Sequence, residues 1–286
     1  IDKIKIGLKI SFVNDFSLIE KILRLREKNW VDFESLYFDC LVEIKVDSDG
    51  KIESLNTQWD FLKTEFLIYL NSTQREIKSN WGNYNLFKND VLKYLFDGYF
   101  VGEVDRPEFE KYYYLNFNFT YVLEELYQFS NIIPIHGKLE DDNSDVLFGY
   151  GNVGHIKYSD VRSHRNQLFR KNLKFNYYSN KTHKNKLFEL IDKDSFDIKI
   201  IGHSCGESDR TLLEEMFNHP NCKSIKIYSR NKEGFERIRN NISMFKNFET
   251  SLSKKIIPFY NLTDNLIIQF NYKSSLINID YKTSLF

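Results

Sequence analysis

Apolar residues recur along the chain with two different periods, and the change of period divides the sequence. Up to about residue 100 they recur every three or four positions, which is the spacing of one face of an α-helix. This spacing predicts helices over 16–28, 30–46 and 57–78, and a shorter helix over 89–96. Beyond residue 112, short continuous apolar runs alternate with helical patterns, so the two parts of the chain have different architectures.

The second part of the chain reads as strands followed by helices. Runs rich in β-branched and aromatic residues predict strands at 112–120, 131–137, 146–151, 197–204 and 224–230. Apolar runs without alternation are typical of parallel strands that are buried on both faces. We therefore predict an α/β fold with a Rossmann-like, doubly wound, mainly parallel sheet.

The same pattern predicts how the chain is organised around that sheet. We expect a single domain over 1–286 with a mainly helical insertion at 30–110 and a basic insertion at 152–195. The last residues, 262–286, alternate between apolar and polar positions around a Lys-Ser-Ser turn, which is typical of a C-terminal β-hairpin.

The charge balance removes two classes of partner at the level of the whole chain. Lys and Arg number 40 and Asp and Glu number 40, so no net field favours nucleic acid or an anionic membrane. No apolar run reaches the roughly 18 residues of a membrane-spanning helix. The three cysteines form no C-x-x-C pair, so we expect a reducing, cytoplasmic location.

A local excess of basic residues departs from this balance between residues 157 and 193. Aromatic residues are interleaved with them, and such a pattern can grip single-stranded nucleic acid. A solvated surface insertion explains the same charges without a ligand, and we favour that interpretation. The basic residues are Lys157, Arg162, Arg165, Arg170, Lys171, Lys174, Lys181, Lys184, Lys186 and Lys193.

The segment Gly202-His-Ser-Cys-Gly206 fits the G-x-S-x-G pattern of a serine hydrolase. That chemistry needs a histidine after the serine, and His219 is the only one that follows. A helix of about nine residues separates it from Ser204 by roughly 14 Å. The same helix separates His203 and Cys205 from His219 and Cys222, so we expect neither a hydrolase triad nor a metal site.

Polar residues instead gather where the predicted strands end. Asn118, His136 and the turn from Gly202 to Asp209 each follow a strand, and ligands of doubly wound sheets bind at the carboxyl ends of strands. A glycine turn before a helix suits a ribose or phosphate group, and a histidine there can act as a base. Simpler interpretations stay open, in which Asn118, Ser208 and Asp209 are helix caps and His136 is structural.

Taken together, these residues resemble the AbiH family of bacterial phage abortive-infection proteins. Each matching motif is short, whereas their order along the chain is specific. The matching segments are Gly7–Phe12 with Asp15–Phe16, Asn29–Glu34, Phe117–Thr120 with Leu123–Glu124, Ile135–Gly137 and Ile201–Asp209.

One part of the family pattern has no counterpart in the printed sequence. The family opens with a strand and a Gly-Asn-Gly-Phe-Asp loop just before the segment that begins here at Gly7, whereas the printed sequence starts at Ile1. That loop, an expected phosphate cradle, either lies outside the printed sequence or is missing from this member.

The pattern is also similar, more distantly, to SIR2-like domains of anti-phage systems, in which an Asn and a His line an NAD site. The resemblance implies that Asn118 holds a ribose or a water, and that His136 accepts a proton as nicotinamide leaves. It implies no metal. The other residues that it places around NAD or a related nucleotide are Thr120, Gly137, Gly202, Ser204, Gly206, Ser208 and Asp209.

The resemblance therefore predicts an abortive-infection effector with a nucleotide cleft that hydrolyses the N-glycosidic bond of NAD. A nucleotide sensor without turnover, or an effector that binds nucleic acid through the basic insertion, is the alternative. We also expect a phage-derived trigger or a partner defence protein, a possible homo-oligomer and no membrane partner.

Overall fold

The computed structural model describes residues 18–24, 30–44, 49–79, 112–125, 130–139, 146–174, 182–229 and 231–257. Predictions for the glycine loop, the helix at 89–96 and the hairpin at 262–286 lie outside these residues. The elements are α2 Leu18–Arg24, α3 Trp30–Glu43, α4 Asp49–Ser79, β1 Tyr114–Asn116, α6 Val122–Glu125, β2 Ile132–Pro134, α7 Tyr158–Arg162, η2 Gln167–Arg170, α9 Thr182–Lys193, β3 Phe196–Ile201, η3 Glu207–Asp209, α10 Arg210–Asn218, β4 Cys222–Tyr228, α11 Lys232–Ser243, η4 Phe248–Leu252 and α12 Ser253–Lys255.

The strands pair in parallel, as the continuous apolar runs predicted. β1 pairs with β2 and β3 pairs with β4. The mixed α/β class is therefore confirmed. A single doubly wound sheet is not, because the described residues form two separate two-stranded ladders.

Side-chain contacts nevertheless place β1 beside β3 in the same direction. The Lys199 ammonium lies 5.4 Å from the centre of the Tyr112 ring, before β1 begins. At the other end, the rings of Phe117 and His203 are 4.2 Å apart, just after β1 and β3 end. The carboxyl ends of these two strands therefore meet at one edge, as expected for the candidate site.

The predicted strand at 146–151 is wrong, since this segment belongs to neither of the two described ladders. Its backbone amides are used elsewhere: Leu147 donates to the His136 carbonyl and Gly149 donates to the Glu34 carboxylate. Only an isolated parallel bridge joins Tyr150 to Leu173. The segment therefore works as a connector between elements and not as a strand.

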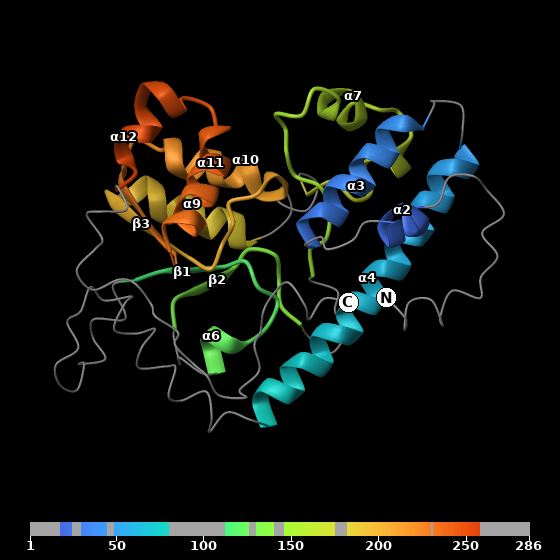
Figure 1. The fold of residues 1–286 in the computed structure, drawn as a ribbon, viewed down its shortest axis with the longest axis horizontal. Coiled ribbons are helices and arrows are strands. Elements are labelled where there is room, and N and C mark those ends of the chain that lie inside the picture. Colours follow the sequence, from blue (N-terminus) through green and yellow to red (C-terminus); the bar gives the residue numbers. More distant parts are fainter. Residues whose placement is uncertain are drawn as a thin grey trace.

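The described residues build two hydrophobic cores, which occupy the two sides of Figure 1. The first surrounds β3 and β4 with α9, α10 and α11. The second joins α2, α3 and α4 to residues 146–173, so the predicted helical and basic insertions pack against each other. None of the helices in the described ranges has both the length and the apolar character needed to cross a membrane.

Three polar side chains fix the second core internally. The Tyr37 hydroxyl donates to Asn56 Oδ1 at 2.6 Å, and Asn172 Nδ2 donates to both of these oxygens at 3.1 Å. All three side chains are buried, and a buried polar group is tolerated only when it is hydrogen-bonded. This network ties α3 and α4 to the turn that precedes Leu173.

We expect Gly149→Ala to destabilise the protein, because a Cβ atom there would lie 2.2 Å from the Asn172 carbonyl oxygen. The backbone must shift to remove this overlap, which costs about 1–3 kcal/mol or more. Chemical denaturation measures the loss. The matched control is Gly50→Ala, where nothing lies within 4 Å of the new atom. In the first turn of α4 it should stabilise the protein by up to about 1 kcal/mol. Equal effects of the two changes would contradict the close packing at Gly149.

Candidate functional site

Charged and ring side chains meet in one buried group at the junction of the two cores. Asp209 lies at its centre. Its Oδ1 atom accepts from Lys174 Nζ at 2.8 Å and lies 2.9 Å from His136 Nε2. Its Oδ2 atom lies 3.5 Å from His203 Nε2. Glu34 Oε2 lies 3.1 Å from Lys174 Nζ. The Asp209 cluster consists of Glu34, His136, Lys174, His203 and Asp209.

Asp209 reaches this position because its carboxylate does not cap a helix. The residue lies at the junction of η3 and α10, but its side chain makes no capping hydrogen bond. The sequence offered capping and ligand binding as its two roles. The structure shows no capping contact, since the carboxylate is occupied by partners from distant segments, and the ligand role stays a prediction.

His136 follows β2, where Gly137 adopts a φ of 81° that favours glycine. Its ring packs edge-on to Phe117 and nearly parallel to Phe119, with centroid distances of 5.4 and 5.9 Å. An ionised carboxylate only accepts hydrogen bonds, so the contact with Asp209 requires a hydrogen on Nε2. In the neutral ring Nδ1 is then the acceptor, and no hydrogen bond engages it within the described residues.

His203 enters the cluster from the turn after β3. Gly202 and Cys205 both have a positive φ, 68° and 54°, which bends the chain sharply around the ring. The Cys205 amide donates to Nδ1 at 3.0 Å. Nε2 must then carry the hydrogen and point it at Asp209.

Lys174 and Glu34 are the members of the cluster to which the sequence assigned no role at the site. Lys174 is only 1% exposed, although its pattern suggested a solvated basic surface. Glu34 comes from α3, and its second oxygen accepts the Gly149 amide at 3.0 Å. No local signal separates Lys174 from the other basic residues nearby, because its burial depends on carboxylates far away in sequence.

The cluster holds the pKa of Asp209 well below its usual value. Burial by itself would raise this pKa, but the Lys174 ammonium and the contacts with His136 and His203 outweigh it. Asp209 is therefore an anion at neutral pH. Burial also raises the pKa of the Cys205 thiol, helped by the charge of Asp209, so this cysteine is a neutral, inert neighbour.

The remaining predicted residues lie around the cluster without joining it. Asn118 is exposed, and its backbone amide donates to Asn116 Oδ1. Ser204 is exposed and only its carbonyl is engaged, by Asn241 at 2.9 Å. The Ser208 hydroxyl is buried without a partner among the described residues. A ligand role for these residues, and for Thr120, Gly137, Gly202 and Gly206, stays a prediction.

The other constellations of the sequence are not assembled at this site. His219 follows α10. Its Nε2 atom lies 3.0 Å from Asp192 Oδ1 and its Nδ1 atom accepts the Asn221 amide at 3.2 Å, so neither ring nitrogen is left for Ser204. In the part of the chain that the structure describes, no group of three His, Cys, Asp or Glu side chains is placed to hold a metal ion.

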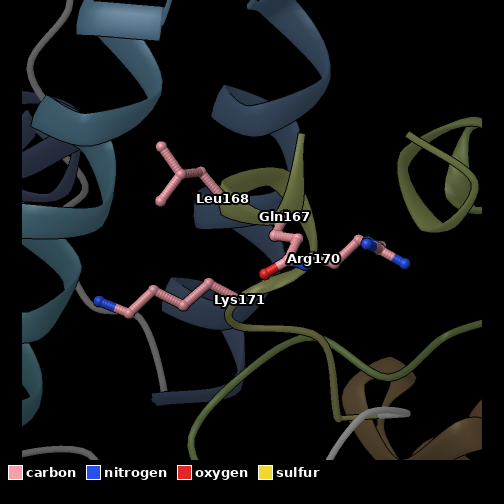
Figure 2. Close-up of a pocket in the computed structure, with 4 residues that line it drawn as sticks. All are labelled: Gln167, Leu168, Arg170 and Lys171. Atoms are coloured by element: carbon pink, nitrogen blue, oxygen red, sulfur yellow. The ribbon is translucent and has the colours of Figure 1, made fainter. Parts of the chain in front are cut away.

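A surface hollow of about 430 Å³ lies elsewhere, beside η2 (Figure 2). It is lined by Gln167, Leu168, Arg170 and Lys171, and contains no predicted site residue. Lys171 also pairs with Asp60 of α4 at 2.7 Å. We therefore place the candidate site at the Asp209 cluster and not at this hollow.

Several basic residues of the 152–195 segment face acidic partners. Lys184 lies 3.3 Å from Glu215 and Lys157 lies 3.7 Å from Asp160. With Lys171 and Lys174 also paired, much of the local excess of charge is compensated. This compensation favours the surface interpretation over nucleic-acid binding, which stays a prediction.

Several of the motifs that resemble a defence family thus meet at this cluster in the part of the chain that the structure describes. A model of the family described as bacteriophage abortive infection AbiH matches residues 10–231. The chain belongs to the AbiH family. It is therefore an abortive-infection protein of antiviral defence. Neither a curated protein nor a solved structure matches the chain.

Three of the segments that carry the AbiH resemblance supply members of the cluster. Glu34 closes the segment Asn29–Glu34, His136 is the centre of Ile135–Gly137, and Asp209 closes Ile201–Asp209. The match to the family spans all of them. Three of the ordered motifs of this AbiH protein therefore converge on one buried charge network.

We expect the stabilising contribution of Asp209 to disappear in acid. Its pKa in the folded protein is below the value of about 3.9 in the unfolded chain. A group with a lowered pKa stabilises the fold fully above the unfolded value, and this contribution is lost as pH falls through the folded value. Asp209→Asn should therefore cost about 3–5 kcal/mol at pH 7, and this difference should narrow below about pH 4. Urea unfolding at a series of pH values measures it.

The control is Asp60→Asn, which removes a carboxylate whose lysine partner is exposed. It should cost no more than about 1 kcal/mol. A difference between wild type and Asp209→Asn that stays constant from pH 7 to pH 3 would show that Asp209 does not stabilise the fold through its charge.

Proposed function

We propose that this AbiH protein is an effector that acts on a ribose-containing nucleotide, with NAD as the first candidate substrate. The reaction would take place where β1, β2 and β3 end. A Rossmann-like arrangement of these strands is part of the proposal. The carrying observation is the contact of 2.9 Å between His136 Nε2 and Asp209 Oδ1.

This contact gives His136 the form that a general base requires. Asp209 holds the hydrogen on Nε2, and the lone pair of Nδ1 is available to a substrate or a water. In the hydrolysis of NAD, the bond from the ribose C1′ atom to nicotinamide breaks and a water oxygen takes its place. His136 Nδ1 would receive the proton of that water, and nicotinamide would leave with the bonding electron pair.

The surroundings of the pair would supply the binding contacts. Asn118 is exposed between Phe117 and Phe119, the two residues whose rings pack on His136. Its amide would meet a ribose hydroxyl. The turn after β3, with Ser204 exposed at its surface, would meet the adenosine side. Asp209 would act through His136 and not on the ribose directly, because its oxygens are already engaged.

One observation favours a second candidate, a nucleotide sensor that does not turn its ligand over. The His136 side chain is only 8% exposed, and a base must reach its substrate within hydrogen-bond distance. If the same cleft binds nucleotide without opening further, binding occurs without chemistry. A nucleotide then stabilises the protein but leaves no product.

We expect His136→Gln to lower nicotinamide release by about 10²-fold or more, because a general base contributes about 10²–10⁴-fold. The purified protein is incubated with NAD and an extract of phage-infected cells, and nicotinamide is quantified by mass spectrometry. The control is His219→Gln, which removes a second His–Asp contact of 3.0 Å at the far end of α10, away from the Asp209 cluster. This variant should keep wild-type activity.

Asn118→Ala should also lower the rate of nicotinamide release, mainly because NAD binds more weakly to this variant. If wild type leaves NAD intact but nucleotides raise its melting temperature, the sensor function is correct and the hydrolase is not. If neither turnover nor stabilisation is observed with any nucleotide, the nucleotide cleft itself is wrong.

A further inference from the structure

We infer that Lys174 is a positioning residue for His136. The Lys174 ammonium keeps Asp209 in the form that only accepts hydrogen bonds, and this carboxylate fixes the hydrogen of the His136 ring on Nε2. The inference rests on the proposed role of His136 as a base. The inference gives Lys174, and through it Glu34, a role in the reaction that the proposed function does not assign to them.

The geometry makes the two contacts of Asp209 dependent on each other. Lys174 Nζ and His136 Nε2 approach the same oxygen, Oδ1, at 2.8 and 2.9 Å. A carboxylate oxygen has lone pairs for two donors. With the ammonium on one of them, the oxygen is oriented and polarised towards the imidazole. The ammonium therefore lies one atom away from the hydrogen bond that defines the tautomer.

Glu34 holds the other side of the ammonium. Its Oε2 atom is 3.1 Å from Lys174 Nζ, and its Oε1 atom is fixed by the Gly149 amide at 3.0 Å. The Lys174 side chain thus lies between a carboxylate from α3 and one from η3. A buried ammonium held between these two described carboxylates has little freedom to leave Asp209.

Stability alone does not account for the use of charges at this place. Removal of one partner from a buried ion pair is costly, but replacement of the whole pair by apolar side chains of similar volume often is not. The groups in contact with the His136 ring are Asp209 from η3 and the rings of Phe117 and Phe119, and His203 lies against the other oxygen of the same carboxylate. Cys205 is held neutral, as described above. Among the described residues Lys174 is the one permanent cation in contact with Asp209.

Removal of Lys174 has a specific consequence for the ring. The ammonium is the largest of the influences that lower the pKa of Asp209, whereas burial raises it. Without the ammonium the carboxyl group takes up a proton more readily and can itself donate to His136 Nε2. The ring hydrogen then moves to Nδ1, and the lone pair that should face the substrate is lost.

The test reads the tautomer directly in the whole protein, without any nucleotide. Lys174→Met/Glu34→Gln removes the ammonium together with its second carboxylate, so that no unpaired glutamate is left buried. Long-range proton–nitrogen NMR correlations of the protein labelled with nitrogen-15 in its histidines report which nitrogen carries the hydrogen at neutral pH. His136 is assigned from the signals that disappear in His136→Gln.

We expect the ratio of the Nε2–H to the Nδ1–H form to fall by about tenfold or more in the double variant, since a hydrogen bond to a charged group is lost. Lys174→Arg, which keeps the positive charge, should retain the wild-type ratio. The matched control is Lys171→Met. Lys171 lies three positions before Lys174 and forms an exposed pair with Asp60, so its loss should leave the tautomer ratio of His136 unchanged. A wild-type ratio in the double variant would overturn the inference, as would a ratio that Lys174→Arg does not preserve.

A second measurement separates this inference from the proposed function. If wild type releases nicotinamide, the double variant should lower kcat by no more than the factor by which the tautomer ratio falls, about tenfold, with little change in KM. If no nucleotide is turned over but the tautomer shifts as expected, the positioning role holds and the proposed reaction fails. If nicotinamide release and the tautomer are both unchanged in the double variant, the reaction stands and the role of Lys174 is wrong.

Discussion

The Lys174 ammonium, buried between the carboxylates of Glu34 and Asp209, is the constraint on which the rest of the structure depends. A charge in an apolar interior is costly unless partners surround it. The partners here come from α3 and from the junction of η3 and α10, and Lys174 itself is 140 residues from Glu34 in sequence. The chain can satisfy this charge only when the two hydrophobic cores dock in one orientation.

Other polar contacts at the same junction favour that orientation. The Tyr150 hydroxyl and the Asn152 amide both donate to the Glu207 carboxylate. The Val153 amide donates to the Thr211 hydroxyl at 3.0 Å. Residues 146–154 thus connect the two cores, although the sequence predicted a strand at their start. Their hydrogen bonds lead into α3 on one side and into the start of α10 on the other.

The sequence predicted those parts of the molecule that local patterns determine. The helical spacing identified α3 and most of α4, and the continuous apolar runs identified β1 to β4 and their parallel direction. The chain order of the histidines argued against a serine-hydrolase triad at Ser204. The bounds were less certain: α4 begins at Asp49, well before the predicted residue 57, because its first turns carry fewer apolar residues.

The parts that were missed are those that depend on distant partners. His136 and Asp209 were expected at one edge of the sheet, and they are in contact, but their direct pairing was not foreseen. Asp209 has the residue type and position of a helix cap, and nothing nearby in the chain shows that its carboxylate turns away. Lys174 resembles its solvated neighbours in every local respect. Only the fold shows that it is buried, since burial requires Glu34 and Asp209 together.

The same long separations determine when the cluster can exist during synthesis. Glu34 is translated early, and His136 precedes Asp209 by 73 residues. An imidazole with its carboxylate and ammonium in place is therefore absent from every nascent chain that ends before α10. The Asp209 cluster is thus a property of the folded chain as a whole and of none of its separate segments.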